Sequence, residues 1–110
     1  MAAYFFTNTP SDLLTSFKSE IDKRCITMWC YDREGDFTHT SEHWKNHAWF
    51  RPSMQSDCLI FNIIRAPANP ISCETYAVYH ACLIQAFLAH LNQIFILSEA
   101  TPSAVDGDSV

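Results

Sequence analysis

The sequence predicts an α+β fold in which an antiparallel three- or four-stranded sheet packs against an N-terminal helix and a long C-terminal helix. Three observations predict this class: an amphipathic helical pattern near the N-terminus, two strand-like segments in the middle, and a helical pattern of about twenty-five residues near the C-terminus. The 110 residues suit one hydrophobic core. We therefore expect a single α+β domain over residues 1–97 and a disordered acidic tail over residues 98–110.

The first helix is expected over about residues 10–24. Thr9 offers a hydroxyl cap, Pro10 suits the first helical position, and Asp12 lies near the positive end of the helix dipole. Apolar residues then recur at helical spacing and form one stripe, so this helix is expected to bury one side. The stripe consists of Leu13, Leu14, Phe17 and Ile21.

The middle of the chain contains the predicted strands. Residues 25–32, "CITMWCYD", alternate between two apolar sets and are rich in aromatic and β-branched residues, as is typical of a strand. Residues 58–65, "CLIFNIIR", are apolar on both faces, which predicts an interior strand. A shorter strand over 48–51, "AWFR", is expected to form a hairpin with it, and a short helix is expected over 41–47.

The C-terminal helical pattern is unusually free of charge. Ser72 or Asn69 is its expected cap, and no Asp, Glu, Lys or Arg occurs between Glu74 and Glu99. Its apolar sector is wider than one sheet contact can cover, which predicts that a second chain, most simply a symmetry mate, covers the rest. A membrane span is not expected, because polar residues are spread through the segment. They are His80, Gln85, His90, Asn92 and Gln93.

The charge pattern argues against nucleic acid as a partner. The net charge is −5, but three of the twelve acids lie in the final stretch, leaving nine acids against seven scattered bases in the rest. The order of elements resembles the α-β-β-β-α run of double-stranded-RNA-binding domains in topology alone. Residues 69–76, "NPISCETY", lack the basic residues that such a domain needs at the start of its last helix.

The five cysteines indicate a reducing compartment. Their spacing contains no C-x-x-C pair, and the first ten residues have no basic leader. Free cysteines then act as small hydrophobic residues. We expect a cytoplasmic protein.

Residues 32–43, "DREGDFTHTSEH", look at first like a metal site. A calcium loop begun at Asp32 would need glycine where Phe37 stands and glutamate where His43 stands. A hairpin turn with Gly35 in the left-handed conformation fits better. His39, His43 and His47 would together supply three zinc ligands, although they lack the H-E-x-x-H spacing; no metal is assigned, and the sequence leaves the question open.

The glycine count excludes several classes of enzyme. With only Gly35 and Gly107, the chain has no P-loop, dinucleotide fingerprint or G-x-S-x-G nucleophile elbow. No cofactor or catalytic residue is assigned. We expect a chain that is more readily a binding protein than an enzyme.

The main functional hypothesis is a small non-enzymatic protein-binding module, homodimeric through the long C-terminal helix, that binds neither nucleic acid nor membranes. The alternative is a small enzyme or ligand-binding protein with a pocket between that helix and the sheet, around Tyr79 and His80. The candidate binding residues are aromatic, apolar or cationic side chains of the kinds that dominate interfaces. They are Trp44, Trp49, Arg51, Tyr76, Tyr79, His80, Leu83 and Phe87.

Overall fold

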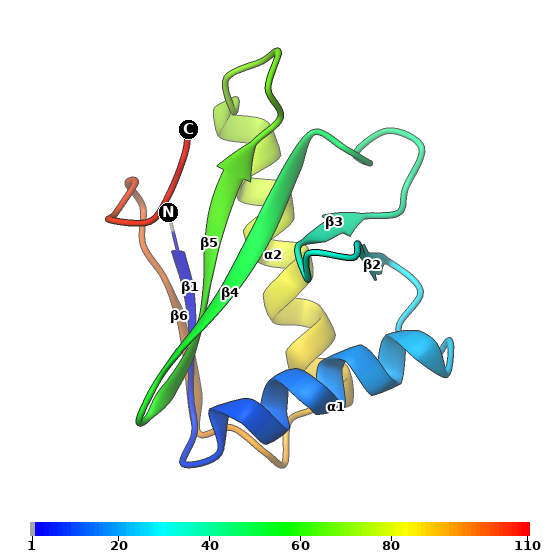
Figure 1. The fold of residues 1–110 in the computed structure, drawn as a ribbon, viewed down its shortest axis with the longest axis vertical. Coiled ribbons are helices and arrows are strands. Elements are labelled where there is room, and N and C mark those ends of the chain that lie inside the picture. The colour runs from blue at the N-terminus through cyan, green and yellow to red at the C-terminus, as the bar shows by residue number, and fades with distance from the viewer. Residues whose placement is uncertain (1) are drawn as a thin grey trace.

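The structure is a computed structural model that describes residues 2–110. It has two helices and six strands (Figure 1). In chain order these are β1 (Ala2–Phe6), α1 (Pro10–Asp22), β2 (Trp29–Tyr31), β3 (Phe37–His39), β4 (Ala48–Gln55), β5 (Cys58–Arg65), α2 (Cys73–His90) and β6 (Leu97–Ala100).

The six strands form one antiparallel sheet in the order β2-β3-β4-β5-β1-β6. The first strand of the chain therefore lies inside the sheet, between two strands from the second half of the sequence. Within the sheet, Phe5 of β1 pairs with Leu59 on β5 and with Ser98 on β6. Both β2 and β6 are edge strands.

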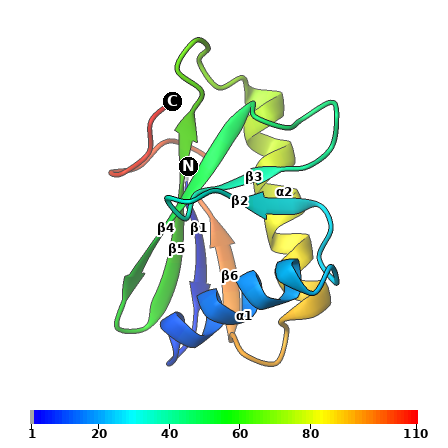
Figure 2. The same ribbon diagram turned by 45° about the vertical axis from the view of Figure 1, so that its right-hand side comes forward.

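Both helices cover the same face of the sheet, as the two ribbon views agree (Figures 1 and 2). The core between them is aromatic. The Phe87 ring of α2 lies 3.9 Å from the Phe5 ring of β1 and 4.7 Å from the Phe17 ring of α1, measured between ring centroids. These three side chains are fully buried, so they join both helices to the sheet.

The C-terminal segment covers part of the opposite face. Val105 packs on a small second cluster formed by Ala2, Cys58 and Ile60. The Asp108 carboxylate accepts hydrogen bonds from the Asn62 amide at 2.8 Å and, through the same oxygen, from a β5 backbone N–H at 3.1 Å. The last residues continue alongside β5 through a parallel bridge between residues 64 and 109.

The α+β class is confirmed, but the predicted count of three or four strands is wrong. The strand over 58–65 has its predicted bounds, and the turn over 32–35 is present with Gly35 at a φ of 82°. The sequence reasoning missed β1 and β6. The five residues of β1 show no alternation because Ala2 and Ala3 are both buried, on opposite faces, and β6 has only one neighbouring strand to constrain it.

Several predicted bounds also differ. The predicted strand over 25–32 is reduced to Trp29–Tyr31, and residues 41–47 form turns instead of a short helix. The long helix ends at His90, and residues 98–110, expected to be disordered, contain most of β6 and a hydrogen-bonded segment. The side chain of Thr9 makes no cap hydrogen bond, although α1 does begin at Pro10. No helix among residues 2–110 combines the length and the apolar character that crossing a membrane requires.

Candidate protein interface

The side of α2 that faces away from the sheet is uncharged over most of its length. Ala77, Ala81 and Leu88 are exposed and Ile84 is half-buried, and these four recur at intervals of four, three and four residues. This spacing places them on one side of a helix, as in the contact line of a coiled coil. We call these four residues the α2 seam.

The start of α2 is fixed by its cap. The Ser72 hydroxyl accepts a hydrogen bond from the Thr75 backbone N–H at 3.1 Å. This satisfies one of the unpaired donors at the helix N-terminus. Glu74 follows in the first turn and is the only Asp, Glu, Lys or Arg on the helix. The α2 seam therefore has one carboxylate at its beginning and no fixed charge after it.

An apolar hollow of about 320 Å³ lies beside Ala77. It is open to solvent and lies between the first turns of α2 and the C-terminal segment. Its lining is mostly apolar and includes Ile71, Tyr76, Pro102, Ala104 and Val110. The hydroxyl of Tyr76 is buried without a hydrogen-bond partner among residues 2–110.

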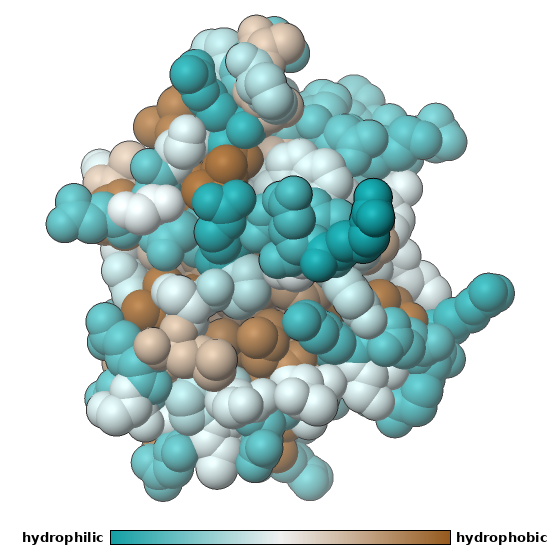
Figure 3. All heavy atoms as spheres, viewed as in Figure 1, coloured by the Kyte–Doolittle hydropathy of each residue, from teal (hydrophilic) through white to brown (hydrophobic). Residues whose placement is uncertain are grey.

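Exposed apolar side chains occur at the end of α2 and in the segment after it. Leu88 is 53% exposed, and Ile96, in the connection between α2 and β6, is 74% exposed. Ile94 and Leu97 are also exposed. This apolar character contrasts with the face shown in Figure 3, which looks onto α1 and β4 and carries mainly hydrophilic and neutral residues with small separate apolar groups.

Four of the five predicted binding residues on α2 lie on its other side. Tyr79, Leu83 and Phe87 are fully buried and His80 is 4% exposed, so all four belong to the chain's own core. The apolar sector of α2 is as wide as the sequence analysis expects, but its large aromatic members face the sheet. Its outward members are smaller, and alanines such as Ala77 and Ala81 give no interface signal in a sequence taken alone.

Tyr79 has a structural role at the β3–β4 loop. Its hydroxyl donates a hydrogen bond to the Trp44 carbonyl and accepts one from the Ala48 N–H at 3.4 Å. The neighbouring Thr38 hydroxyl donates to the Ala48 carbonyl at 2.8 Å and accepts from the Asn46 N–H at 3.1 Å. Together these bonds hold the second half of the loop and the start of β4 against α2 and β3.

The remaining predicted binding residues do not meet in one place. Trp44 is half-buried in the β3–β4 loop, and Trp49 is half-buried on the sheet face opposite the helices. The Arg51 guanidinium forms a bidentate ion pair with the buried Asp36 carboxylate, with nitrogen–oxygen distances of 2.9 and 3.2 Å. Tyr76 alone adjoins the α2 seam, through the hollow beside Ala77.

The three histidines considered as zinc ligands are not brought together. His39 is buried, its Nδ1 accepts the Ser41 N–H at 3.1 Å, and its Nε2 has no partner among residues 2–110. Burial lowers the pKa of His39, which favours the neutral ring. His43 and His47 are exposed, with ring centroids 6.5 Å apart.

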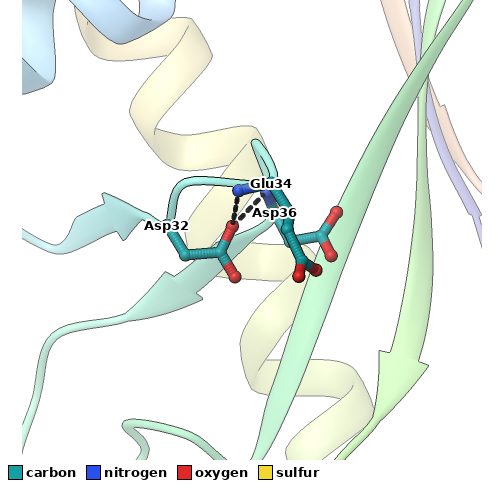
Figure 4. Close-up of side chains that lie close together, drawn as sticks. All are labelled: Asp32, Glu34 and Asp36. Carbon is teal, nitrogen blue, oxygen red and sulfur yellow. Dashed lines mark hydrogen bonds between the residues drawn. The ribbon is translucent and has the colours of Figure 1, made fainter.

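The acidic turn gathers three carboxylates (Figure 4). Asp32, Glu34 and Asp36 offer oxygens within 4.8 Å of one another. One Asp32 oxygen already accepts the backbone N–H groups of Glu34 and Asp36, and the Asp36 carboxylate is paired with Arg51. These bonds account for the cluster as a stabilised hairpin turn.

Three of the five cysteines have thiols that their surroundings keep protonated. All five are free thiols. Burial raises the pKa of Cys82 and of Cys58, which keeps both protonated. Desolvation, with a smaller contribution from the Asp32 charge, also raises the pKa of Cys30.

Comparison with known proteins adds no assignment. No protein-family model, curated protein or solved structure was found to match the chain. The candidate interface therefore depends on the geometry of α2 and its surroundings.

Proposed function

We propose that this chain is a small, non-enzymatic, cytoplasmic protein-binding module that self-associates through the α2 seam. The observation that carries the proposal is the exposed, uncharged outward side of α2, where Leu88 is 53% exposed. Covering this side with a second chain removes apolar surface from water, which favours association. Exposed apolar residues that recur along one side of a helix are typical of helix–helix contacts.

A second copy of the same chain is the simplest partner. Two-fold homodimers are the commonest oligomers of soluble proteins, and a helix face can cover its own symmetry mate. The absence of fixed charge between Ala77 and Leu88 allows two such faces to meet without burying an unpaired ion.

The alternative, an enzyme or ligand-binding protein with a pocket around Tyr79 and His80, has less support. Both side chains are buried in the core, and the Tyr79 hydroxyl is bonded to the β3–β4 loop. A ligand there would have to displace the chain's own contacts.

Analytical ultracentrifugation tests the proposal. The wild-type chain should sediment at about twice its mass of 12.6 kDa. Ala81→Arg places a charge in the middle of the α2 seam and should give a monomer, because the guanidinium would lose its water on association.

Ala89→Arg is the matched control. It makes the same substitution on the same helix, at an exposed position about 80° around the axis from Ala81. This variant should remain a dimer. A wild-type chain that stays monomeric at several hundred micromolar, or an Ala81→Arg variant that dimerises like the wild type, would contradict the proposal.

A further inference from the structure

The α2 seam is graded in size along the helix. Its first two members, Ala77 and Ala81, are small, and its last two, Ile84 and Leu88, are large. The intervals between them read the same in both directions along the helix. A seam with this pattern is complementary to its own reverse.

Two such helices fit when they run antiparallel. A two-fold axis across the helix between Cys82 and Leu83 places Leu88 of each copy opposite Ala77 of the other, and Ile84 opposite Ala81. Every contact then joins a large side chain to a small one, which fills space evenly. A parallel pair would place Leu88 against Leu88 and leave a gap between the two Ala77 positions.

The hollow beside Ala77 provides room for the incoming side chain. Its volume of about 320 Å³ is more than enough for a leucine side chain, and its mostly apolar lining would not leave polar groups buried beneath one. Residues of the C-terminal segment, including Pro102 and Val110, form its outer wall. Without a second copy this hollow is open, while Leu88 at the other end of the same helix is exposed.

The polar ends of α2 favour the same direction. Glu74 lies in the first turn and His90 in the last. Antiparallel alignment brings each Glu74 towards the His90 end of the other copy and sets opposite ends of the helix dipoles side by side. A parallel pair would place the two Glu74 carboxylates together, which repel.

We infer that two copies associate through antiparallel α2 helices, with Leu88 of each copy seated against Ala77 and the apolar hollow of the other. This arrangement rests on the proposed self-association and specifies its geometry. It also makes the C-terminal segment part of the interface, because that segment forms one wall of the hollow.

A size exchange tests the arrangement. Ala77→Leu should oppose leucine to leucine, and Leu88→Ala should empty the hollow, so each single variant should weaken dimerisation at least about tenfold. The double variant exchanges the large and small members and should return to within about threefold of wild type. Both positions are exposed, so each variant should unfold at a similar urea concentration to the wild type when monomeric.

The outcomes separate the two proposals. A double variant no better than the single variants, with a dimeric wild type, overturns the antiparallel arrangement and leaves self-association standing. A monomeric wild type overturns the proposed function itself.

Disulfide crosslinking gives an independent readout. In a background with Ser at the exposed Cys25, Cys30 and Cys73, the double variant Ala77→Cys with Leu88→Cys should form a covalent dimer under mild oxidation. Either substitution alone should not. Efficient crosslinking of Ala77→Cys alone would show a parallel pair and overturn the inference.

Discussion

At the scale of single residues, Tyr79 shows how a side chain that resembles a binding residue can serve the fold. A tyrosine among histidine and cysteine on an apolar helix is compatible with a ligand pocket. Its hydroxyl instead bonds to backbone groups of Trp44, in the middle of the β3–β4 loop, and of Ala48, where β4 begins. These long-range contacts cannot be read from local sequence, because no pattern within α2 indicates which loop it meets.

Tyr79→Phe should therefore lower the free energy of unfolding by about 1–3 kcal/mol, because buried backbone groups lose their partner. Urea denaturation followed by tryptophan fluorescence measures this loss. Tyr4→Phe is the matched control, since Tyr4 is half-buried on the other sheet face and takes part in no hydrogen bond through its hydroxyl among residues 2–110; it should change the stability by less than about 0.5 kcal/mol. Equal effects of the two substitutions would rule out the proposed role of Tyr79.

At the scale of elements, strong periodicity made some segments predictable. β5 is apolar on both faces apart from Asn62 and the final Arg65, and α1 has a proline start and one apolar stripe, so both are found close to their predicted positions. β1 and β6 are short and depend on pairing with each other, a long-range condition that their own residues do not encode. For the same reason the sequence predicts an excess of apolar surface on α2 but does not show which of its residues face away from the sheet.

The C-terminal segment is an element held mainly by polar contacts. Asp108→Ala removes the acceptor for Asn62 and for a β5 backbone N–H, and should cost about 1–3 kcal/mol of unfolding free energy. The neighbouring Asp106 accepts through its backbone carbonyl, so Asp106→Ala should cost less than about 0.5 kcal/mol. Thermal or urea denaturation of both variants compares them directly, and a larger loss in Asp106→Ala would contradict this description of the segment.

The same carboxylate predicts a pH dependence. Burial acts to raise the pKa of Asp108, but hydrogen bonds, among them those from Val105 and Asn62, outweigh it and leave the pKa lowered. Because the folded pKa lies below the unfolded one, the stabilisation is complete above the unfolded pKa of about 3.9 and disappears as the pH falls through the folded pKa. Urea denaturation between pH 5 and pH 2.5 should show a steeper loss for wild type than for Asp108→Ala. Parallel curves would exclude this contribution.

At the scale of the whole molecule, the sheet has helices on one face and only the C-terminal segment on part of the other (Figure 2). In our proposal, a second copy of the chain covers the outward side of α2.

Association that favours the folded state makes stability depend on protein concentration. A hundredfold rise in concentration should therefore raise the melting temperature by about 5 °C for wild type and leave Ala81→Arg unchanged. Calorimetry at the two concentrations checks this, and a wild-type melting temperature independent of concentration would count against self-association.

The position of β1 between β5 and β6 bears on how the protein is made. The ribosome produces this strand first, yet its two neighbours are among the later segments to be translated. The backbone groups of β1 that pair with β5 therefore wait until residue 65 has been synthesised, and those that pair with β6 wait until residue 100. Pairing of distant segments is slow. The aromatic strand "AAYFF" therefore keeps one unpaired edge while residues 7–96 are translated, and the sheet is complete only once β6 has been made.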